Sequence, residues 1–284
     1  MSAMVAPVIV LGAAGMLGTD LVAAMRASGL SPQGYDLPEF DITREADLLK
    51  AVKPGSVVVN CAAYTNVEKA QSEPERAYAV NAAAVECLGR IASDRAAWVL
   101  HISTDFVFDG TLGRPYVETD VPNPLNIYGR TKLDGERQLA ASGCKHCVLR
   151  VQWTYGRAGD NFVRKIANAA RARAALQVVD DQVGSPTATT EVAAAIVELI
   201  VRAQRPTGLL HFAAAGHASR YAVARFIIAG LGMGTEVVPC RTCDFPSVAS
   251  RPLNSRFDCT RMQRLLGRPI EAWQGPLGRF LEGL

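Results

Sequence analysis

Apolar positions along this chain follow two patterns: short uninterrupted runs, and longer segments in which they recur every three or four residues. Uninterrupted runs are typical of strands buried on both faces, and the wider spacing is typical of helices with one buried face. Strands are therefore predicted at 8–11, 33–37, 56–64, 98–103, 147–153, 177–180 and 208–213. Helices are predicted from about residue 17 and at 45–51, 68–92, 128–141, 161–175, 191–203 and 220–231, with one more in the loop-rich tail. The alternation up to residue 104 predicts an α/β fold with a doubly wound parallel sheet.

Some helix ends carry their own signals. Asp41 or Thr43 is predicted to cap the helix at 45–51, and Thr189 or Thr190 the helix at 191–203, because these side chains accept hydrogen bonds from the first free amides. The helix at 68–92 is expected to be interrupted near Pro74.

The first strand breaks directly into the glycine-rich turn GAAGMLG. Gly12 allows a sharp turn, Gly15 lets a bound group approach the backbone, and Gly18 lets the following helix pack close to the strand. The free amides at the start of that helix favour an anion, most often a pyrophosphate. The spacing GxxGxxG also occurs in ordinary strand–turn–helix units, so it needs support from the rest of the chain.

An acidic residue, Asp36, ends the second predicted strand, 24 residues beyond Gly12. An acid at this place can accept hydrogen bonds from an adenosine ribose 2′-hydroxyl and repels a 2′-phosphate. The alternative is that Asp36 caps a local backbone group.

Several residues are expected at the carboxyl edge of the sheet, where ligands bind in such folds. Ala62 and Ala63 follow the third strand and leave space there, while the fourth strand delivers Thr104 and Asp105. Asn81, in the apolar stripe of the long helix, is either a satisfied core residue or one that holds a neighbouring strand.

Tyr128 and Lys132 lie four residues apart and project from one face of their helix. Hydride transfer to a ketone leaves charge on the carbonyl oxygen, which requires a proton donor and a hydrogen-bond donor. A nearby ammonium lowers the pKa of a phenol, so Lys132 is expected to tune Tyr128 and to hold the nicotinamide ribose. Thr104 is the expected second donor. His101 is interpreted as a core residue, and the pair alone also fits a plain amphipathic helix.

Composition excludes several other classes. The net charge is only +3 on 284 residues and no basic run stands out, so nucleic acid is not an expected partner. No stretch approaches 18 uncharged apolar residues, and the apolar segment at 4–17 lacks a basic start, so neither a membrane span nor a signal peptide is predicted. A cytoplasmic location is expected. The chain has no GxSxG motif, so an acyl-transfer enzyme is not predicted.

Seven cysteines include two CxxC pairs, Cys144/Cys147 and Cys240/Cys243. Together they have the ligands of a four-thiolate zinc site, but 92 residues separate the pairs and Cys147 opens a buried strand. Reduced thiols without metal are therefore predicted.

Taken in order, GAAGMLG, NCAAYTNVEKAQSEPERAYAVNA, STDFVFDG, NPLNIYGRTKLDGE, RVQWTYGRAGDNF, VDDQVGSPT and RPLNSRFD cover nearly the whole chain, with DIT at 41–43. In these stretches the chain resembles the extended short-chain dehydrogenase/reductases and, within them, the dTDP-4-dehydrorhamnose reductase family. The resemblance implies a Rossmann-type sheet domain at 1–155, with a returning segment at about 187–211. It also implies a smaller α/β substrate-binding domain at 156–186 and 212–284.

The resemblance also implies roles for individual residues. The implied catalytic residues are Thr104, Tyr128 and Lys132. The implied cofactor-binding residues are Gly12, Ala14, Gly15, Met16, Leu17, Gly18, Asp36, Asp41, Ile42, Cys61, Ala62, Ala63, Thr65 and Lys132. The implied substrate-binding residues are Asp105, Phe106, Trp153 and Gln182.

The chain departs from the family pattern at three positions. Phe106 stands where many members have Tyr, which removes a hydroxyl near the substrate. Some members form a dimer through magnesium held by glutamates, but here Asp20 stands at one such place and Thr190 at another. No tightly bound metal is predicted, and a homodimer stays open.

The implied activity is NAD(P)H-dependent reduction of the 4-keto group of dTDP-4-dehydro-L-rhamnose. Two alternatives remain at this stage. One is a reductase of another dTDP-4-ketodeoxysugar, and the other is a non-catalytic subunit similar to the regulatory subunit of methionine adenosyltransferase.

Overall fold

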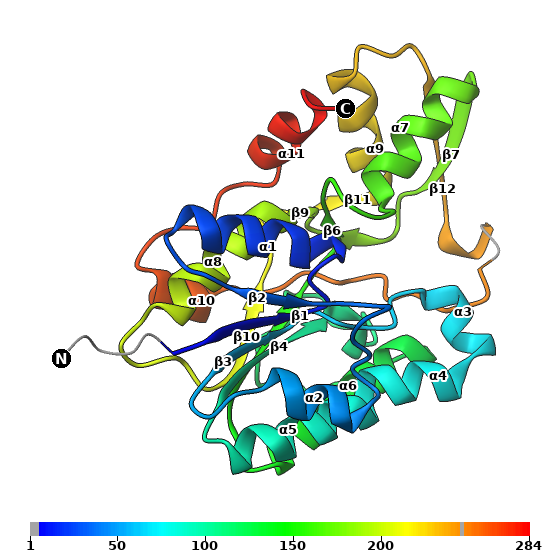
Figure 1. The fold of residues 1–284 in the computed structure, drawn as a ribbon. Helices are drawn as coiled ribbons and strands as arrows, with labels where there is room; N and C mark the ends of the chain where they lie inside the picture. Colours follow the sequence, from blue (N-terminus) through cyan, green and yellow to red (C-terminus); the bar gives the residue numbers. More distant parts are fainter. Residues whose placement is uncertain (1–5, 245–246) are drawn as a thin grey trace.

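A six-stranded parallel sheet forms the centre of the computed structural model, which describes residues 6–244 and 247–284 (Figure 1). Its strand order is β10-β5-β4-β3-β1-β2. The strands are β1 (Val8–Leu11), β2 (Gln33–Tyr35), β3 (Val57–Asn60), β4 (Trp98–Thr104), β5 (Lys145–Val151) and β10 (Gly208–Phe212). The chain reverses its direction of winding between β1 and β3, which confirms the doubly wound prediction and places a ligand crevice at their carboxyl ends.

Helices cover both faces of this sheet, as Figure 1 shows. One face packs on α1 (Met16–Ala27), α8 (Thr189–Ile200) and α10 (Thr260–Leu266), and the other on α2 (Glu45–Ala51), α5 (Ala84–Asp94) and α6 (Ile127–Ala141). Successive residues of β1 point to opposite faces, so Val8 and Val10 join the first core and Ile9 and Leu11 the second. Burial on both faces explains the uninterrupted apolar runs.

The long helix predicted at 68–92 is broken, as expected. It consists of α3 (Val67–Ser72), α4 (Pro74–Tyr78), a π-helical turn η1 (Ala79–Ala83) and α5. Asn81 lies in the π turn and is buried; its side chain accepts a hydrogen bond from the Tyr64 amide (2.9 Å) and donates to the Tyr64 carbonyl (3.1 Å). Asn81 therefore holds the segment that follows β3, which was one of its two predicted roles.

A second core lies beyond the carboxyl edge of the sheet. Its helices are α7 (Phe162–Ala172), α9 (Arg220–Gly230) and α11 (Gln274–Leu281), and β7 (Ala175–Val179) pairs in parallel with β12 (Glu236–Cys240). Short pairs join β6 (Thr154–Tyr155) to β9 (Thr187–Ala188) and β8 (Val183–Gly184) to β11 (Ala218–Ser219), and η2 (Asp105–Val107) and η3 (Thr242–Asp244) are single turns. The strand β12 was not predicted: it begins between the helix predicted at 220–231 and the tail from residue 239 that was interpreted as loop-rich, and it runs into that tail.

The predicted division into two domains stays a prediction, and the packing adds one detail to it. Met262 and Leu266 of α10 belong to the core of the large sheet, although their segment was grouped with the second part.

The predicted caps of α2 and α8 are wrong. Arg44 and Ala188 occupy the N-cap positions, and neither makes a side-chain cap. Asp41 instead accepts from the amide and hydroxyl of Thr43, which lowers the pKa of its carboxyl group, and the Thr189 hydroxyl bonds to Asp20. These side chains found tertiary or turn partners instead of helix amides.

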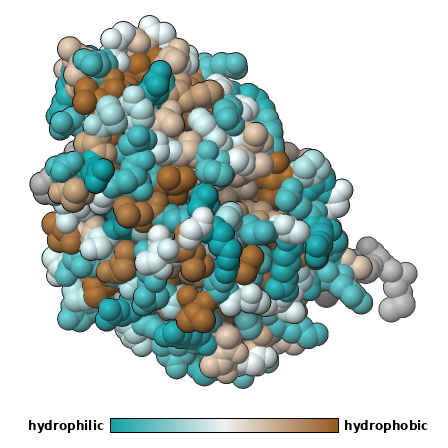
Figure 2. Space-filling model, turned by 180° about the vertical axis from the view of Figure 1, so that it is seen from behind, coloured by the Kyte–Doolittle hydropathy of each residue, from teal (hydrophilic) through white to brown (hydrophobic). Residues whose placement is uncertain are grey.

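Within residues 6–244 and 247–284, the search for a helix with the length and hydropathy of a membrane span finds none. On the face in Figure 2, apolar residues are interspersed with polar ones.

Candidate active site

The glycine-rich turn between β1 and α1 is shaped by two close backbone contacts. Gly12 has φ +75°, and a Cβ there would stand 2.6 Å from the Ala62 amide nitrogen; a Cβ on Gly18 would stand 2.0 Å from the Gly12 carbonyl oxygen. Gly15, by contrast, is exposed and caps α1 without a side-chain hydrogen bond. The glycines at 12 and 18 hold the turn tight, and the one at 15 leaves the helix start open to a ligand.

Asp36 is bound to this same turn. Its Oδ2 accepts from the Ala14 amide (2.7 Å) and its Oδ1 from the Leu37 amide (2.8 Å). The local capping that was the alternative interpretation is therefore present, and the carboxylate lies at the rim of the crevice beside β1.

Residues from two other strand ends complete this rim. After β3, Cys61 is half-buried against the first core, and desolvation raises the pKa of its thiol to about 12, whereas Thr65 is exposed. Farther along, Ile42 is buried in the second core beside Asp41. Met16 and Leu17 form the first turn of α1, where Leu17 packs on the first core.

Thr104 and Tyr128 come from the carboxyl end of β4 and the start of α6. Asn126 caps α6 by accepting from the Gly129 amide (2.8 Å), and a Cβ on Gly129 would stand 2.1 Å from the Phe106 carbonyl oxygen. The close contact brings the Phe106 and Tyr128 rings edge to face, with centroids 5.6 Å apart. The helix start thus places the phenol beside the end of β4.

The pKa of Tyr128 moves opposite to the prediction. Burial raises it to about 12, the Thr104 hydroxyl opposes this by hydrogen bonding, and the Asp105 carboxylate adds to it. The prediction that Lys132 lowers the pKa of Tyr128 is wrong for the chain without cofactor, because the Lys132 side chain bonds to other groups.

Lys132 is buried and turns towards β4. Its Nζ donates to the Ile102 carbonyl (2.7 Å) and lies 3.2 Å from His101 Nε2. His101 Nδ1 lies 3.1 Å from Asn60 Nδ2, and Asn60 Oδ1 accepts from the Ala62 amide (3.1 Å). Burial lowers the pKa of Lys132 to about 8, partly offset by Glu136 and Cys61.

A buried ion pair holds α6 in place one helical turn beyond Lys132. Arg150 of β5 donates to Glu136 through Nε (2.9 Å) and Nη2 (2.6 Å), and the Ser103 hydroxyl also bonds to Glu136. Both charged side chains are at least nine-tenths buried. This pair fixes α6 against β4 and β5 below Lys132.

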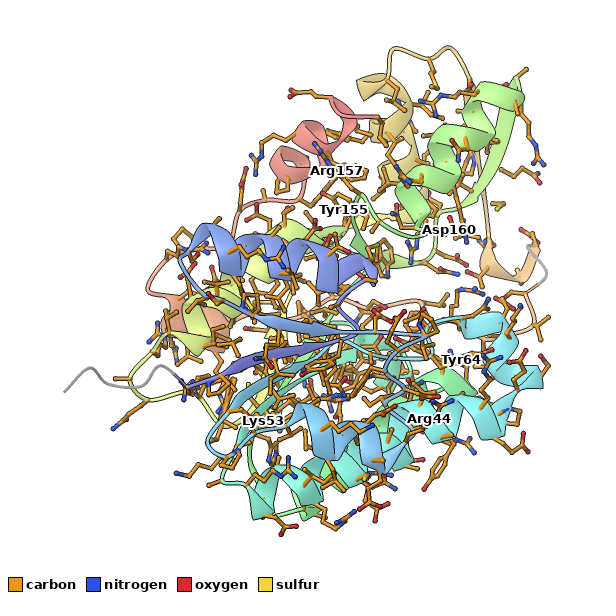
Figure 3. The ribbon with its side chains drawn as sticks, viewed as in Figure 1. Arg44, Lys53, Tyr64, Tyr155, Arg157 and Asp160 are labelled. Carbon is orange, nitrogen blue, oxygen red and sulfur yellow. The ribbon has the colours of Figure 1, made fainter. Side chains whose placement is uncertain are left out.

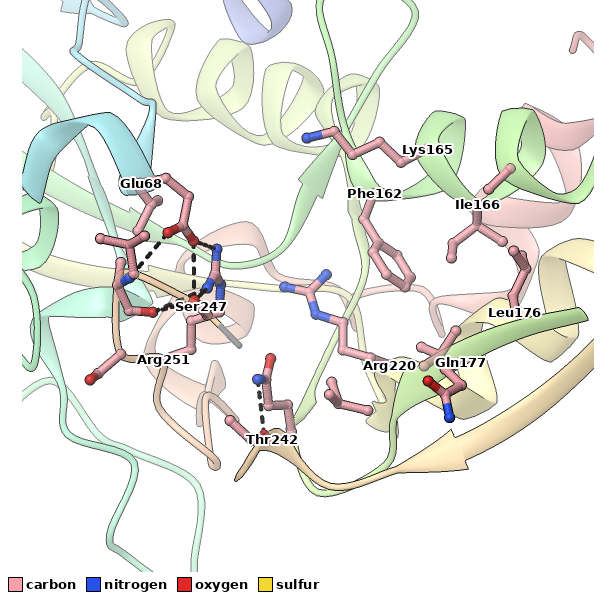
Figure 4. Close-up of a pocket in the computed structure, with 18 of the residues that line it drawn as sticks. Glu68, Phe162, Lys165, Ile166, Leu176, Gln177, Arg220, Thr242, Ser247 and Arg251 are labelled. Carbon is pink, nitrogen blue, oxygen red and sulfur yellow. Dashed lines mark hydrogen bonds and ion pairs between the residues drawn. The ribbon is translucent and has the colours of Figure 1, made fainter. Parts of the chain in front are cut away.

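A pocket of about 1280 Å³ opens between the sheet edge and the second core (Figure 4). Phe106, Gln182 and Arg220 line it, as do Arg173 and Lys165. Arg220 extends into the pocket beside Phe162 in Figure 4. The pocket is therefore rich in cations.

The Arg220 guanidinium is held by aromatic rings. Its Cζ lies 3.6 Å from the centroid of the Trp153 ring and 4.7 Å from that of Phe162. Burial lowers its pKa to about 10, so it stays charged near neutral pH. Among the described residues its side chain makes no hydrogen bond. Trp153 itself has a positive φ of 41°, a strained conformation that often marks functional positions.

Asp105 is the acid whose charge acts on this cation. Its Oδ1 accepts from Thr104 Oγ1 (3.1 Å), whereas its buried Oδ2 has no partner among the described residues. Burial raises the pKa of Asp105 to about 6, and Arg220 acts against that rise.

The remaining predicted polar sites are separate from this crevice. Asp20, Thr190 and Tyr155 line a small cavity of about 170 Å³. Figure 3 shows Tyr155 above α1. The cysteine pairs belong to different sheets, Cys147 to β5 and Cys240 to β12. Within the described part of the chain no group of three or more His, Cys, Asp or Glu residues forms a metal-binding cluster.

Sequence patterns did not single out Arg220, Asn60 or Glu136. Asn60 ends an apolar strand at the carboxyl edge, which is a usable signal. Arg220 and Glu136 lie in helices where a charged residue is ordinarily solvent-exposed, so only the fold reveals them.

A glycine turn at the switch point of a parallel sheet, beside a helix that carries Tyr128 and Lys132, is the architecture of the extended short-chain dehydrogenase/reductases. The model of the RmlD substrate binding domain family matches residues 6–284. A dTDP-4-dehydrorhamnose reductase of Aggregatibacter actinomycetemcomitans is 36% identical over 286 residues (96% of this chain, 97% of that protein), and one of Mycolicibacterium smegmatis is 39% identical (95% and 83%). The crystal structure of dTDP-4-dehydrorhamnose reductase from Bacillus anthracis in complex with NADP superposes with a TM-score of 0.92 at 32% identity, covering 99% of this chain and 100% of that one. The chain belongs to the dTDP-4-dehydrorhamnose reductase family.

Proposed function

We propose that this chain is an enzyme that reduces the 4-keto group of dTDP-4-dehydro-L-rhamnose with NADPH or NADH, giving dTDP-L-rhamnose. One observation carries the proposal. Thr104, Asp105 and Tyr128 lie together, and they adjoin Phe106 and Arg220, which line the cation-rich pocket. A dinucleotide on one side and a nucleotide sugar on the other would meet at the phenol.

The residues at the crevice fit a dinucleotide. Gly15 is exposed at the uncapped start of α1, so the amides of the first helical turn and the helix dipole favour a pyrophosphate there. In the proposed complex Asp36 would face the adenosine ribose, Ala62, Ala63 and Thr65 would form the wall, and Lys132 would lie at the nicotinamide end. When bound, the reduced nicotinamide supplies the hydride.

Tyr128 and Thr104 serve the oxygen of the ketone. A raised pKa keeps the Tyr128 phenol protonated at neutral pH, so it has a proton to give as negative charge develops on the oxygen. Thr104 offers a second hydrogen bond to that oxygen. The Thr104 hydroxyl donates to Asp105 in the chain without ligand, so it must turn to the ketone oxygen to make this bond.

The pocket cations suit the diphosphate of a sugar nucleotide. Arg220 presents a charged guanidinium, because Trp153 and Phe162 hold its flat faces and leave its edge free. Gln182, whose Nε2 donates to Thr242 (3.1 Å), and Phe106 line the same pocket. Phe106 lacks the hydroxyl that many family members carry at this position, so this wall of the pocket is apolar.

The decisive experiment follows the loss of reduced nicotinamide absorbance with enzymatically prepared dTDP-4-dehydro-L-rhamnose, with product identification by NMR. Turnover to dTDP-L-rhamnose is expected. A different epimer or a preference for another dTDP-4-ketosugar selects the first alternative. No turnover, together with binding to a methionine adenosyltransferase, selects the second.

We further propose a cytoplasmic location and no nucleic-acid partner, in line with the near-neutral charge of the chain. A homodimer stays open, and light scattering across a concentration series decides it.

A further inference from the structure

A buried line of polar groups runs from the crevice wall into the helix that carries Tyr128. It connects the Ala62 amide, Asn60, His101 and Lys132 through three contacts of 3.1, 3.1 and 3.2 Å. Asn60 and His101 are fully buried and Lys132 is 2% exposed, so water does not compete for these groups. None of these contacts is required by the packing of the sheet, since apolar residues fill the same faces elsewhere.

The direction of each hydrogen bond follows from the first one. The Ala62 amide can only donate, so the oxygen of the Asn60 amide must face it. The Asn60 nitrogen then faces His101 Nδ1 and donates to it. A neutral imidazole that accepts at Nδ1 carries its proton on Nε2, which points at the Lys132 nitrogen.

Two donors cannot share one hydrogen bond. Because His101 Nε2–H faces Lys132 Nζ, this contact is a hydrogen bond only when that nitrogen offers a lone pair, as an amine does and an ammonium does not. The amine keeps a proton for its bond to the Ile102 carbonyl (2.7 Å). His101 is itself kept neutral, since burial lowers its pKa well below the ordinary value.

We propose that Asn60 and His101 are positioning residues: they form a polarised relay from the Ala62 amide that favours the uncharged amine form of Lys132 over the ammonium in the chain without cofactor. The inference rests on the proposed function for its importance, since only the charged form of Lys132 can assist Tyr128. Burial also favours the amine, whereas the other groups facing Lys132, Glu136 on α6 and Cys61 after β3, favour its charged form.

The test is a titration of the cofactor-free chain labelled with lysine carrying 13C at Cε and with 15N-histidine. The chain has an internal control, because its other lysines are all exposed: Lys50, Lys53, Lys69, Lys145 and Lys165. The wild-type 15N spectrum is expected to show His101 protonated at Nε2 and bare at Nδ1. Lys132 is expected to titrate well below the five controls.

Two variants at one position separate the relay from mere packing. His101→Gln can accept from Asn60 and donate to Lys132, so the pKa of Lys132 should stay within about 0.3 units of wild type. His101→Phe fills the space but donates nothing, so the pKa should rise by about 0.5–1 unit, the equivalent of one hydrogen bond.

The sign of the shift decides the matter. The proposal is wrong if the pKa of Lys132 falls in the His101→Phe variant, or if wild-type His101 is protonated at Nδ1. Either result means that His101 accepts a hydrogen bond from an ammonium. Equal shifts in both variants also overturn it. If the Phe variant does not fold, the wild-type tautomer and the Gln variant still give the answer. Because no substrate or cofactor is used, a chain without reductase activity can still pass this test.

Discussion

The two sides of Tyr128 differ in how their polar side chains are paired. On the side of α6 and β4, Lys132, His101 and Asn60 are bonded to one another, and Glu136 is bonded to Arg150. On the pocket side, Arg220 is held by ring stacking and makes no hydrogen bond among the described residues, and Asp105 Oδ2 is likewise without a partner there. On the first, closed side, charged groups that are hydrogen-bonded to each other position the reacting residues. On the second, open side, charged groups that lack a protein hydrogen-bond partner among the described residues are free to bind a ligand.

The largest effect is expected at the boundary between these sides. Tyr128→Phe keeps the ring and the contact with Phe106 but removes the proton donor, so kcat should fall by about 10²–10⁴-fold. Cofactor affinity should change little, because the phenol acts in the transition state. Stopped-flow reduction and fluorescence titration measure the two quantities. The control is Tyr78→Phe, whose exposed hydroxyl bonds only to Gln138. Retention of more than about a tenth of the rate, with chemistry rate-limiting, assigns the acid elsewhere.

On the closed side, breaking a pair should cost stability. Glu136→Gln leaves the Arg150 charge buried with a weakened partner, and we expect the free energy of unfolding to fall by about 3 kcal/mol or more. The matched control is Glu198→Gln, which removes the exposed pair with Arg268 and should cost less than about 1 kcal/mol. Urea unfolding curves compare the two. Similar losses in both variants would show that the buried pair has no special role.

On the open side, removing a charge should cost affinity and not stability. Arg220→Met keeps an apolar stem against Trp153 and Phe162 but loses the cation, so the KM for the sugar nucleotide should rise by about 10–100-fold. The Tm should change little, since no protein partner among the described residues loses a hydrogen bond and the lost interactions are the cation–ring contacts and the attraction to Asp105. Arg225→Met, on the same helix and also near a ring, is the control. An unchanged KM would place the diphosphate elsewhere in the pocket.

A smaller effect is expected at Asp36, whose carboxylate is already occupied by the Ala14 and Leu37 amides. Its charge should still disfavour a 2′-phosphate, so kcat/KM with NADPH should not exceed that with NADH by more than about tenfold, about 1.4 kcal/mol. Asp36→Asn should move the ratio towards NADPH. A wild-type ratio above tenfold contradicts the role given to this carboxylate.

No effect at all is expected from metal removal. Dialysis against a chelator should leave turnover unchanged, because the two CxxC pairs lie in separate sheets and Cys147 is buried in β5. Elemental analysis checks the same point directly, and one zinc per chain would overturn it.

Local pattern was sufficient for much of this molecule. The apolar runs predicted six strands of the large sheet, the turn GAAGMLG its crevice, and the spacing of Tyr128 and Lys132 their shared helix face, since each depends on neighbours within a few residues. The break at Pro74 also follows from chemistry of that residue alone. The caps at Asp41 and Thr189 failed because both side chains had competing partners, in one case from a distant helix.

Protonation and partnership were decided only in three dimensions. The Tyr–Lys spacing predicts a lowered phenol pKa, but burial raises it, and Lys132 turns instead to His101, 31 positions away in the chain. The sequence by itself determined which residues reach the carboxyl edge of the sheet, because strand direction and helical periodicity are local properties. Only the tertiary structure decided which of them are bonded to each other and which stay open, because burial and hydrogen-bond partners come from segments that the chain brings together from far apart.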